Sequence, residues 1–280
     1  MKEINSLLIM AGGISSRMKR SLKDSTVATE IKIKAKAVHK SLIPLGSNQR
    51  PLLYYIIKNA ETAGYKNIYL ITSPENIAFH TQLEKWKKNK IFADINIRFA
   101  LQYVTEGREK PLGTADAIQQ ALDQYPELEK ATFTVCNGDN LYSTSVFKML
   151  RKVRKVPHAL ISYARSGLGF SDERIAKFAI IDIDSKGYFK NIIEKPKAIE
   201  VDHYKDATGE VRVSMNAFSF HGALLYPYLK NCPIHPERNE KELPEALRLM
   251  NKAQPKKTIC LPVNEHLPDL TSAEDILEFD

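Results

Sequence analysis

Residues 7–18 read LLIMAGGISSRM, and this stretch decides how the rest of the chain is interpreted. Its first four residues form a short, continuous apolar run, which is typical of a strand buried on both faces. The small residues at 11–13 then allow a tight turn, in which successive free N–H groups can bind an anion. Arg17 adds a planar, permanently charged donor that suits phosphate oxygens. Glycine motifs this short also occur in ordinary turns from a strand to a helix, so both interpretations stay open at this point.

The composition is that of an ordinary globular chain with a basic balance. The 280 residues are 43% hydrophobic and 26% charged, which is enough to bury a substantial core in one large domain. The formal net charge of +8 favours an anionic partner, such as a nucleic acid, an acidic membrane or a phosphorylated small molecule. Because no nucleic-acid-binding signature is present, we expect a phosphorylated small molecule, and neither a nucleic acid nor a membrane, as the partner.

Export and membrane signals are not recognisable in the sequence. The apolar run near the N-terminus is too short and too weakly basic for a secretory signal, and no apolar stretch approaches the roughly 20 residues that cross a bilayer. Cys136, Cys232 and Cys260 are far apart and lack the spacing of metal ligands, so we expect reduced thiols in the core. These features predict a cytoplasmic protein.

Strand and helix patterns alternate along the first half of the chain. Apolar residues recur at helical spacing from Leu52 to Ala60. The following predicted elements are the strands 68–72, 95–101 and 131–136 and the helices 74–90 and 114–124. Strands that alternate with helices at this interval pair in parallel through right-handed crossovers. The pattern predicts an α/β fold with a doubly wound, mostly parallel, Rossmann-like sheet.

The second half changes to a strand-rich pattern. The predicted strands are 158–164, 177–184, 188–194, 211–220 and 257–263, and the predicted helices are 223–229, 241–251 and one that begins near Ser272. Such an insertion of strands could form the wall of a second substrate site. No linker separates the two halves, so we expect them to fold together.

Residues 19–39 form the least regular segment of the first half. Lysine and arginine outnumber acidic residues in it, and it offers little apolar material to hold it down. Long connections inside compact domains are either mobile or cover active sites. We expect a mobile, basic lid that a triphosphate would order.

The opening of the chain resembles a known family at three places. AGGISSRM at 11–18, KSLIPL at 40–45 and RPLL at 50–53 are similar to the first motifs of the sugar-phosphate nucleotidyltransferase family. Members of that family join a nucleoside triphosphate to a sugar 1-phosphate and release pyrophosphate. Two positions depart from the family pattern: Ser15 stands where glycine is usual, and His39 precedes the lysine where proline is usual.

Further stretches match the same family, so the resemblance extends from Leu7 to Leu277. They are PLGTADAI at 111–118, NGDN at 137–140, IEKPK at 193–197, SMNA at 214–217 and LPDLT at 267–271. The resemblance implies a GT-A-like nucleotidyltransferase fold in one domain, residues 1–280. Residues 1–156 would form the nucleotide-binding half, and residues 157–280 the half that binds the sugar phosphate.

The resemblance and the charges of the matched residues together imply roles in the reaction. Attack of a sugar-phosphate oxygen on the α-phosphorus brings two anions together, so catalysis requires positioning and charge neutralisation. Arg17 would brace the β- and γ-phosphates, Lys40 would lie near the α-phosphate, and Lys195 would hold the phosphate of the sugar. Glu194 would accept hydrogen bonds from sugar hydroxyls, with Asn216 nearby. No general base is required, because a phosphate monoester is already an anion near neutral pH.

Asp139 and Asp269 would hold Mg²⁺, although well over a hundred residues separate them. Mg²⁺ prefers oxygen ligands and keeps water molecules alongside substrate phosphates. The residues expected at the nucleotide are Ala11, Gly12, Gly13, Gln102, Gly113 and Thr114.

Gln102 carries the prediction for the base. Family members that prefer uridine or thymidine nucleotides have a glutamine at this point. A glutamine amide can donate to a pyrimidine carbonyl and accept from the ring N3–H, which cytosine lacks. We therefore expect UTP or dTTP. Residues 113–117 also resemble adenylyl-transferring members and residues 15–18 resemble cytidylyl and guanylyl transferases, so the other nucleotides stay open.

The acceptor and the activity each have an alternative. Phe218 stands where the family's Asn-x-Gly places glycine, so a modified hexose or a non-sugar phosphate such as phosphocholine is an alternative acceptor. A catalytically weak homologue that binds nucleotide-sugar is the alternative from a different class. The matched charged residues speak against it. The sequence leaves open whether the chain forms a homo-oligomer.

Overall fold

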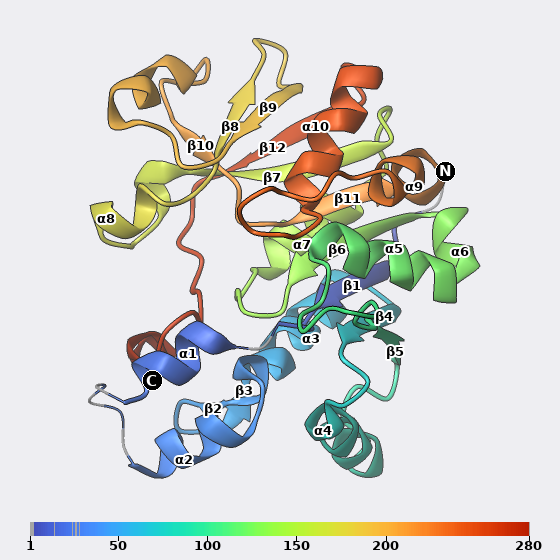
Figure 1. Cartoon of the computed structure of the whole chain (residues 1–280), viewed down its shortest axis with the longest axis vertical. Helices are drawn as coiled ribbons and strands as arrows, with labels where there is room; N and C mark the ends of the chain where they lie inside the picture. The colour runs from blue at the N-terminus through green and yellow to red at the C-terminus, as the bar shows by residue number, and fades with distance from the viewer. Residues whose placement is uncertain (1–2, 14, 24, 26, 28, 280) are drawn as a thin grey trace.

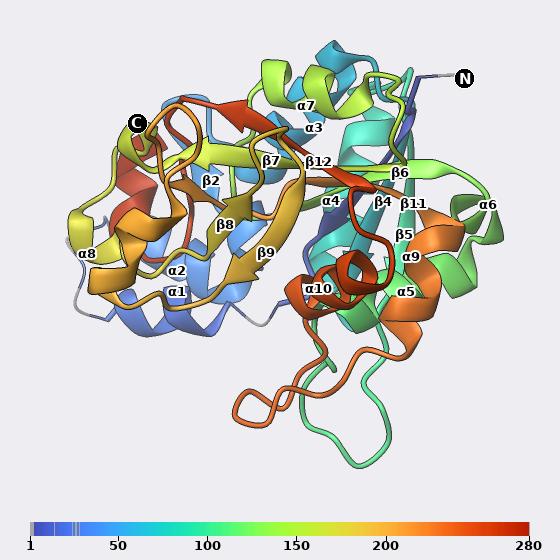
Figure 2. The same cartoon turned by 90° about the horizontal axis from the view of Figure 1, so that it is seen from above.

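The computed structural model describes residues 3–13, 15–23, 25, 27 and 29–279. One mixed sheet of ten strands runs through both halves of the chain. Helices cover both faces of this sheet, as the two perpendicular views show (Figures 1 and 2). The arrangement confirms the predicted α/β fold with a largely parallel central sheet.

The first half of the chain forms the parallel part of the sheet. β1 (Ser6–Met10) lies between β4 (Asn67–Thr72) and β6 (Thr132–Asn137) and pairs in parallel with both. β5 (Asn96–Leu101) continues the sheet in parallel beyond β4. The three central residues of β1 are fully buried, because the strand packs against a separate apolar cluster on each of its faces. The continuous apolar run at residues 7–10 is thus explained by this central position.

Helices of the first half supply both apolar clusters. α3 (Leu52–Ala63), α4 (Ile77–Lys88) and α7 (Thr144–Arg151) pack on one face of the sheet. α5 (Thr114–Gln124) and α6 (Pro126–Glu129) pack on the opposite face. The predicted helices are confirmed here to within a few residues at each end.

The second half extends the same sheet with mixed pairing. β11 (Phe218–His221) joins the halves, because it is antiparallel both to β6 and to β7 (His158–Ala164). Beyond β7 the sheet continues through β10 (Arg212–Val213), β8 (Ile180–Ile183) and β9 (Phe189–Ile193). β12 (Thr258–Val263) also pairs in parallel with β7, but it is not part of this linear order of strands. α9 (Gly222–Lys230) and α10 (Leu243–Ala253) cover the face that α5 also covers.

Two predictions for the second half are wrong in detail. The single strand expected at 211–220 is divided into β10 and β11, and the chain leaves the sheet between them. Asn216 lies in this break with a left-handed φ of 56°, a conformation that asparagine tolerates better than most residues. The terminal helix is the short 3₁₀ segment η4 (Glu274–Phe279), which begins two residues later than expected.

The segment 19–39 is more ordered than its composition suggested. α1 (Ser16–Ser21) and α2 (Thr29–Ala37) occupy much of it, and η1 (Lys40–Leu42) follows. Leu22, Val27 and Ala35 are buried in an apolar cluster, so the expectation of little apolar anchoring is wrong. Residues 24, 26 and 28 lie outside the described residues. The closing of this segment over a triphosphate stays a prediction.

The three cysteines are free and buried, as expected. None of the helices in the described part of the chain has both the length and the apolar character needed to cross a bilayer.

Candidate functional site

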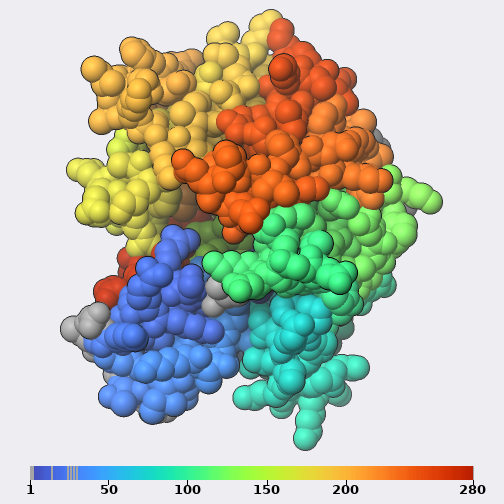
Figure 3. Space-filling model, in the orientation of Figure 1, coloured from blue at the N-terminus to red at the C-terminus, as the bar shows by residue number. Residues whose placement is uncertain are grey.

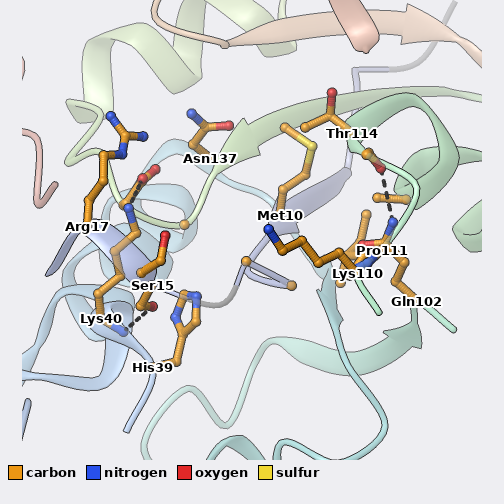
Figure 4. Close-up of a pocket in the computed structure, with 18 of the residues that line it drawn as sticks. Met10, Ser15, Arg17, His39, Lys40, Gln102, Lys110, Pro111, Thr114 and Asn137 are labelled. Carbon is orange, nitrogen blue, oxygen red and sulfur yellow. Dashed lines mark hydrogen bonds and ion pairs between the residues drawn. The ribbon is translucent and has the colours of Figure 1, made fainter. Parts of the chain in front are cut away.

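A pocket of about 450 Å³ opens at the carboxyl ends of β1, β5 and β6. The space-filling view shows the cleft between the surfaces of the two halves in which it lies (Figure 3). Its lining includes the following predicted residues: Gly12, Gly13, Arg17, Lys40, Gln102, Gly113, Thr114 and Asp139. Arg17 and Lys40 lie together at one end of the pocket, whereas Gln102 and Thr114 lie at the other end (Figure 4). The end with Arg17 and Lys40 suits phosphates, and the other end, which also carries Lys110, offers the Gln102 amide and Thr114 to a base.

The loop after β1 forms the floor between the two ends. A Cβ atom on Gly12 would lie 3.0 Å from Gln102 Oε1, so a side chain at this position would crowd the Gln102 amide. Ala11 is buried and bonded through its N–H to the Ile71 carbonyl oxygen at 2.8 Å, and it does not line the pocket. Ala11 therefore holds the loop against β4 and does not line the pocket, so the structure does not support its predicted contact with the nucleotide.

Ser15 takes a left-handed conformation, with φ of 55°, at the position where the resemblance expects glycine. A non-glycine residue in this region costs of order 1 kcal/mol. The Ser15 hydroxyl accepts a hydrogen bond from the Lys40 backbone N–H at 3.2 Å, which offsets part of that cost. The backbone geometry of a glycine is thus kept, and the serine adds a link to η1.

His39 is a structural residue at the start of η1. Its Nδ1 accepts a hydrogen bond from the Ser41 backbone N–H at 3.2 Å, and its ring packs against Phe79. Burial, together with the positive charge of Lys40, lowers the pKa of His39 to about 4. The imidazole is therefore neutral near pH 7 and adds no charge beside Lys40.

Gln102 is almost fully buried at the end of β5. Its amide nitrogen donates to the Gly113 carbonyl oxygen and to Asp116 Oδ2, each at 3.0 Å. Both N–H groups of the amide are thereby used within the protein. We expected Gln102 both to donate a hydrogen bond to a base and to accept one from it. Only Oε1 remains available, so Gln102 can accept a hydrogen bond from a base but cannot donate one.

Residues of the second half pack against the segment around Gly113 and Thr114. Gly113 has a left-handed φ of 112°, and a Cβ atom there would lie 2.5 Å from the Lys241 carbonyl oxygen. The same oxygen accepts the Ala115 N–H at 3.0 Å, and the Thr114 hydroxyl accepts the Leu243 N–H at 2.9 Å. Glycine at position 113 is thus needed for the contact between the two halves.

Asp139 and Asp269 lie side by side, as predicted. Their segments are joined by backbone hydrogen bonds from Leu270 N–H to the Asp139 carbonyl oxygen at 2.8 Å and from Leu141 N–H to the Pro268 carbonyl oxygen at 2.9 Å. Burial of the Asp269 carboxyl group raises its pKa, and the negative charge of Asp139 raises it further. The two carboxylates therefore repel each other.

Each of the two carboxylates already contacts a cation. Lys40 Nζ donates to Asp139 Oδ2. Arg174 Nη2 donates to Asp269 Oδ2 at 2.7 Å. Asp139 lines the pocket, whereas Asp269 is buried and does not line it.

The donor set fits a magnesium ion that is shared with a substrate. Among the described residues, no group of three or more His, Cys, Asp or Glu side chains could hold a metal. Two mutually repelling carboxylates suit Mg²⁺, which commonly uses one or two carboxylates together with substrate phosphates and water. Asp139 and Asp269 could supply those two carboxylates.

A second pocket, of about 460 Å³, adjoins the first. Both pockets share the lining residues Met10, Arg17, Thr114 and Glu240. Glu194, Lys195 and Asn216 line the second pocket, as the resemblance implied. Glu194 is paired with Arg238, whereas Lys195 and Arg17 make no ion pair within the described part of the chain. Lys195 and Arg17 are thus available to an anion that spans both pockets, and Lys110, which lines the first pocket, likewise makes no ion pair with the described residues.

Two arginines of the site were not predicted from the sequence. Arg238 pairs with Glu194 and, at 2.9 Å, with Glu242, and Arg174 contacts Asp269. Neither arginine stands in a recognised motif, and Glu194 and Asp269 are 44 and 95 positions away from their arginines along the chain. Phe218, which had left the acceptor in doubt, is buried in an apolar cluster and lines neither pocket.

The known proteins that resemble this chain in sequence are nucleotidyl transferases. The family model for nucleotidyl transferase matches residues 35–263. The chain is 24% identical over 177 residues to a glucose-1-phosphate adenylyltransferase of Koribacter versatilis (strain Ellin345), covering 62% of this chain and 41% of that protein. It is 28% identical over 193 residues to glucose-1-phosphate adenylyltransferase 1 of Vibrio vulnificus (strain YJ016), covering 68% and 43%. The chain spans less than half the length of the curated relatives that it matches.

Solved structures share the fold over almost the whole chain. A UDP-glucose pyrophosphorylase complexed with UDP-glucose superposes with a TM-score of 0.69 at 18% identity, covering 98% of this chain and 96% of that one. A Bacillus anthracis protein named as a glucose-1-phosphate thymidylyltransferase, in complex with sucrose, superposes with a TM-score of 0.67 at 15% identity, covering 98% and 93%.

Proposed function

Because this chain belongs to the nucleotidyl transferase family, we propose that it joins a nucleoside triphosphate to a sugar 1-phosphate and releases pyrophosphate. The observation that carries this proposal is the pair of adjoining pockets with Arg17 at their junction. The triphosphate occupies the first pocket and the sugar 1-phosphate occupies the second. A pyrophosphate-release assay with both substrates tests the proposal.

The reaction follows from the charges that line the two pockets. An oxygen of the sugar phosphate attacks the α-phosphorus, the bond between the α-phosphorus and its bridging oxygen breaks, and pyrophosphate leaves with the bonding electrons. Lys195 holds the attacking phosphate in the second pocket. Arg17, at the junction, neutralises charge on the leaving pyrophosphate, and Lys40 neutralises charge at the α-phosphate.

Asp139 and Asp269 are proposed to hold Mg²⁺. When bound, the ion would neutralise phosphate charge and orient the phosphates for in-line displacement. In the structure Lys40 donates to Asp139. Release of Lys40 from Asp139 would let its ammonium group turn to the α-phosphate, so binding of the metal and positioning of Lys40 depend on each other.

UTP or dTTP is the proposed nucleotide. Gln102 Oε1 faces the base end of the first pocket beside Gly12, and its amide nitrogen is held by Gly113 and Asp116. A fixed acceptor suits the N3–H of uracil or thymine, and it leaves an oxygen unpaired when cytosine binds in the same register. ATP is the second candidate, because the curated relatives are adenylyltransferases.

Gln102→Leu is expected to change the ranking of nucleotides. The loss of one acceptor should lower kcat/KM for UTP or dTTP about tenfold more than for CTP, in line with one hydrogen bond to the base. Pyrophosphate release with each nucleotide measures this. Gln119→Leu is the matched control, because Gln119 lies on α5 and lines neither pocket. An unchanged ranking in Gln102→Leu, or a wild-type preference for a purine, contradicts the proposed role of Gln102.

A sugar 1-phosphate is favoured over a non-sugar acceptor. The second pocket combines the carboxylate of Glu194 with the ammonium group of Lys195 and the amide of Asn216. This set provides acceptors for hydroxyl groups beside a cation for the phosphate. Phosphocholine has no hydroxyl groups to use the acceptors, so it serves as the comparison substrate.

A further inference from the structure

Arg174 joins the connection between β7 and β8 to the C-terminal segment that contains Asp269 and Asp275. It belongs to α8 (Asp172–Ile175), a single turn between β7 and β8. Its Nη2 donates to Asp269 Oδ2 at 2.7 Å and to the Asp269 carbonyl oxygen at 3.2 Å. Its Nη1 donates to Asp275 Oδ1 at 2.6 Å. One planar guanidinium group therefore spans two carboxylates.

Asp275 gives the guanidinium group a rigid anchor. The side chain of Asp275 is nearly fully buried, and its Oδ2 accepts the backbone N–H groups of Thr271 at 2.7 Å and Ser272 at 2.5 Å. The ring of Phe170 lies 4.2 Å from the guanidinium carbon on another side. Arg174 is thus fixed by partners other than Asp269, so it can act as a support for Asp269.

The two oxygens of Asp269 differ in their partners. Oδ2 accepts from Arg174 and from the Thr271 hydroxyl at 2.9 Å. Oδ1 is 3.1 Å from that same hydroxyl, which cannot donate its one proton fully to both oxygens. One oxygen is therefore fixed from outside while the other keeps unused acceptor capacity. Carboxylates that bind metals are commonly held in this way by an outer hydrogen-bond donor.

We propose that Arg174 is a positioning residue that holds Asp269 in place for metal binding beside Asp139; this inference rests on the proposed function. The same turn also reaches the second pocket, because Lys177 and Phe178 line it and the Lys177 N–H is bonded to the Arg174 carbonyl oxygen at 3.1 Å. Arg174 thus connects the wall of the acceptor pocket to the metal carboxylate.

Arg174→Gln tests this role through metal affinity. The variant should bind Mn²⁺ about tenfold or more weakly, as is typical when the outer partner of a metal ligand is lost. Electron paramagnetic resonance of free Mn²⁺, without substrates, measures this affinity. In turnover, the Mg²⁺ concentration for half-maximal rate should rise by a similar factor, with a smaller change in the KM of either substrate. Arg174→Lys should give an intermediate Mn²⁺ affinity, because lysine keeps the charge but cannot span both carboxylates.

Arg212→Gln is the matched control. Arg212 makes another buried ion pair in the same half, to Asp206 at 2.6 Å, and lines neither pocket. It should lower the thermal midpoint without changing Mn²⁺ affinity. Unchanged Mn²⁺ affinity in a folded Arg174→Gln overturns the proposal, and tighter binding overturns it in favour of competition between Arg174 and the metal.

The outcomes separate this inference from the proposed function. If no substrate pair gives turnover but Arg174→Gln still weakens Mn²⁺ binding, the proposed function fails and the role of Arg174 stands. If wild-type turnover is normal and Arg174→Gln binds Mn²⁺ like wild type, the role of Arg174 fails alone. If Asp139→Asn does not remove Mn²⁺ binding, the ion is held elsewhere and the inference is overturned.

Discussion

Asp139→Asn is expected to lower kcat by about 100-fold or more, which is the typical loss for a central electrostatic group. Asp139 lines the first pocket beside Lys40, and its segment is paired by backbone hydrogen bonds with the segment of Asp269. Asparagine keeps the shape of the side chain but removes the charge that a metal ion requires. Asp269→Asn should have an effect of the same order. Pyrophosphate release at saturating substrates in Mg²⁺ measures both, and thermal unfolding shows whether each variant stays folded.

Asp182→Asn is the control for this loss of charge. Asp182 is paired with Lys190 at 2.9 Å in the hairpin of β8 and β9, and it lines neither pocket. Its variant removes a carboxylate from a lysine pair without touching the site, so kcat should stay near that of the wild type. Normal turnover of either Asp139→Asn or Asp269→Asn in Mg²⁺ would rule out the metal assignment.

Lys40→Met is expected to lower kcat by about 100-fold as well, since it removes a cation from the developing phosphate charge. Its effect on the metal should differ from that of Asp139→Asn. Because Lys40 Nζ donates to Asp139 Oδ2, the ammonium group competes with a metal ion for this carboxylate. Mn²⁺ affinity without substrates should therefore be unchanged or higher in Lys40→Met, and abolished in Asp139→Asn.

Lys190→Met gives the matched control, because it removes the lysine of the Asp182 pair. It should change neither kcat nor Mn²⁺ affinity. If Lys40→Met weakens Mn²⁺ binding as strongly as Asp139→Asn does, then Lys40 supports the metal site and does not compete with it. That result would contradict the proposed exchange of Lys40 from Asp139 to the α-phosphate.

The features that were predictable from the sequence are those encoded by local patterns. The apolar run at residues 7–10 predicted a strand that is covered on both faces, and β1 indeed packs against one apolar cluster on each face. Because ligands bind at the carboxyl ends of parallel strands, the loop after β1 and Asp139 were expected at the same site. The predicted pairing of Asp139 with Asp269 rested on the family resemblance, and backbone hydrogen bonds between their segments confirm that the two are neighbours.

The features that were not predictable depend on contacts between distant residues. Arg174 and Asp269 are 95 positions apart, and nothing in the turn around Arg174 marks it as a partner of an acidic residue. The orientation of the Gln102 amide depends likewise on Gly113 and Asp116. Residues 19–39 were misjudged for a related reason. A few buried residues, including Leu22 and Val27, anchor a stretch whose average composition is basic.

The division of the strand expected at 211–220 has a functional consequence. Apolar residues alternate from Val211 to Ala217, and the alternation restarts at Phe218 one position out of phase, next to the left-handed Asn216 where the chain leaves the sheet. That departure is what places Ser214 and Asn216 at the second pocket. Local propensity predicts the strand, whereas the site requires the break.

Release of pyrophosphate is the measurement that tests the central claim most directly. The purified protein is incubated with Mg²⁺ and each of UTP, dTTP, ATP, CTP and GTP, in combination with a panel of sugar 1-phosphates and with phosphocholine. We expect release that requires a sugar 1-phosphate, is fastest with UTP or dTTP, and is lost in Asp139→Asn. Release with phosphocholine but with no sugar 1-phosphate, or no release with any pair while nucleotide-sugar still binds, would contradict the proposed function.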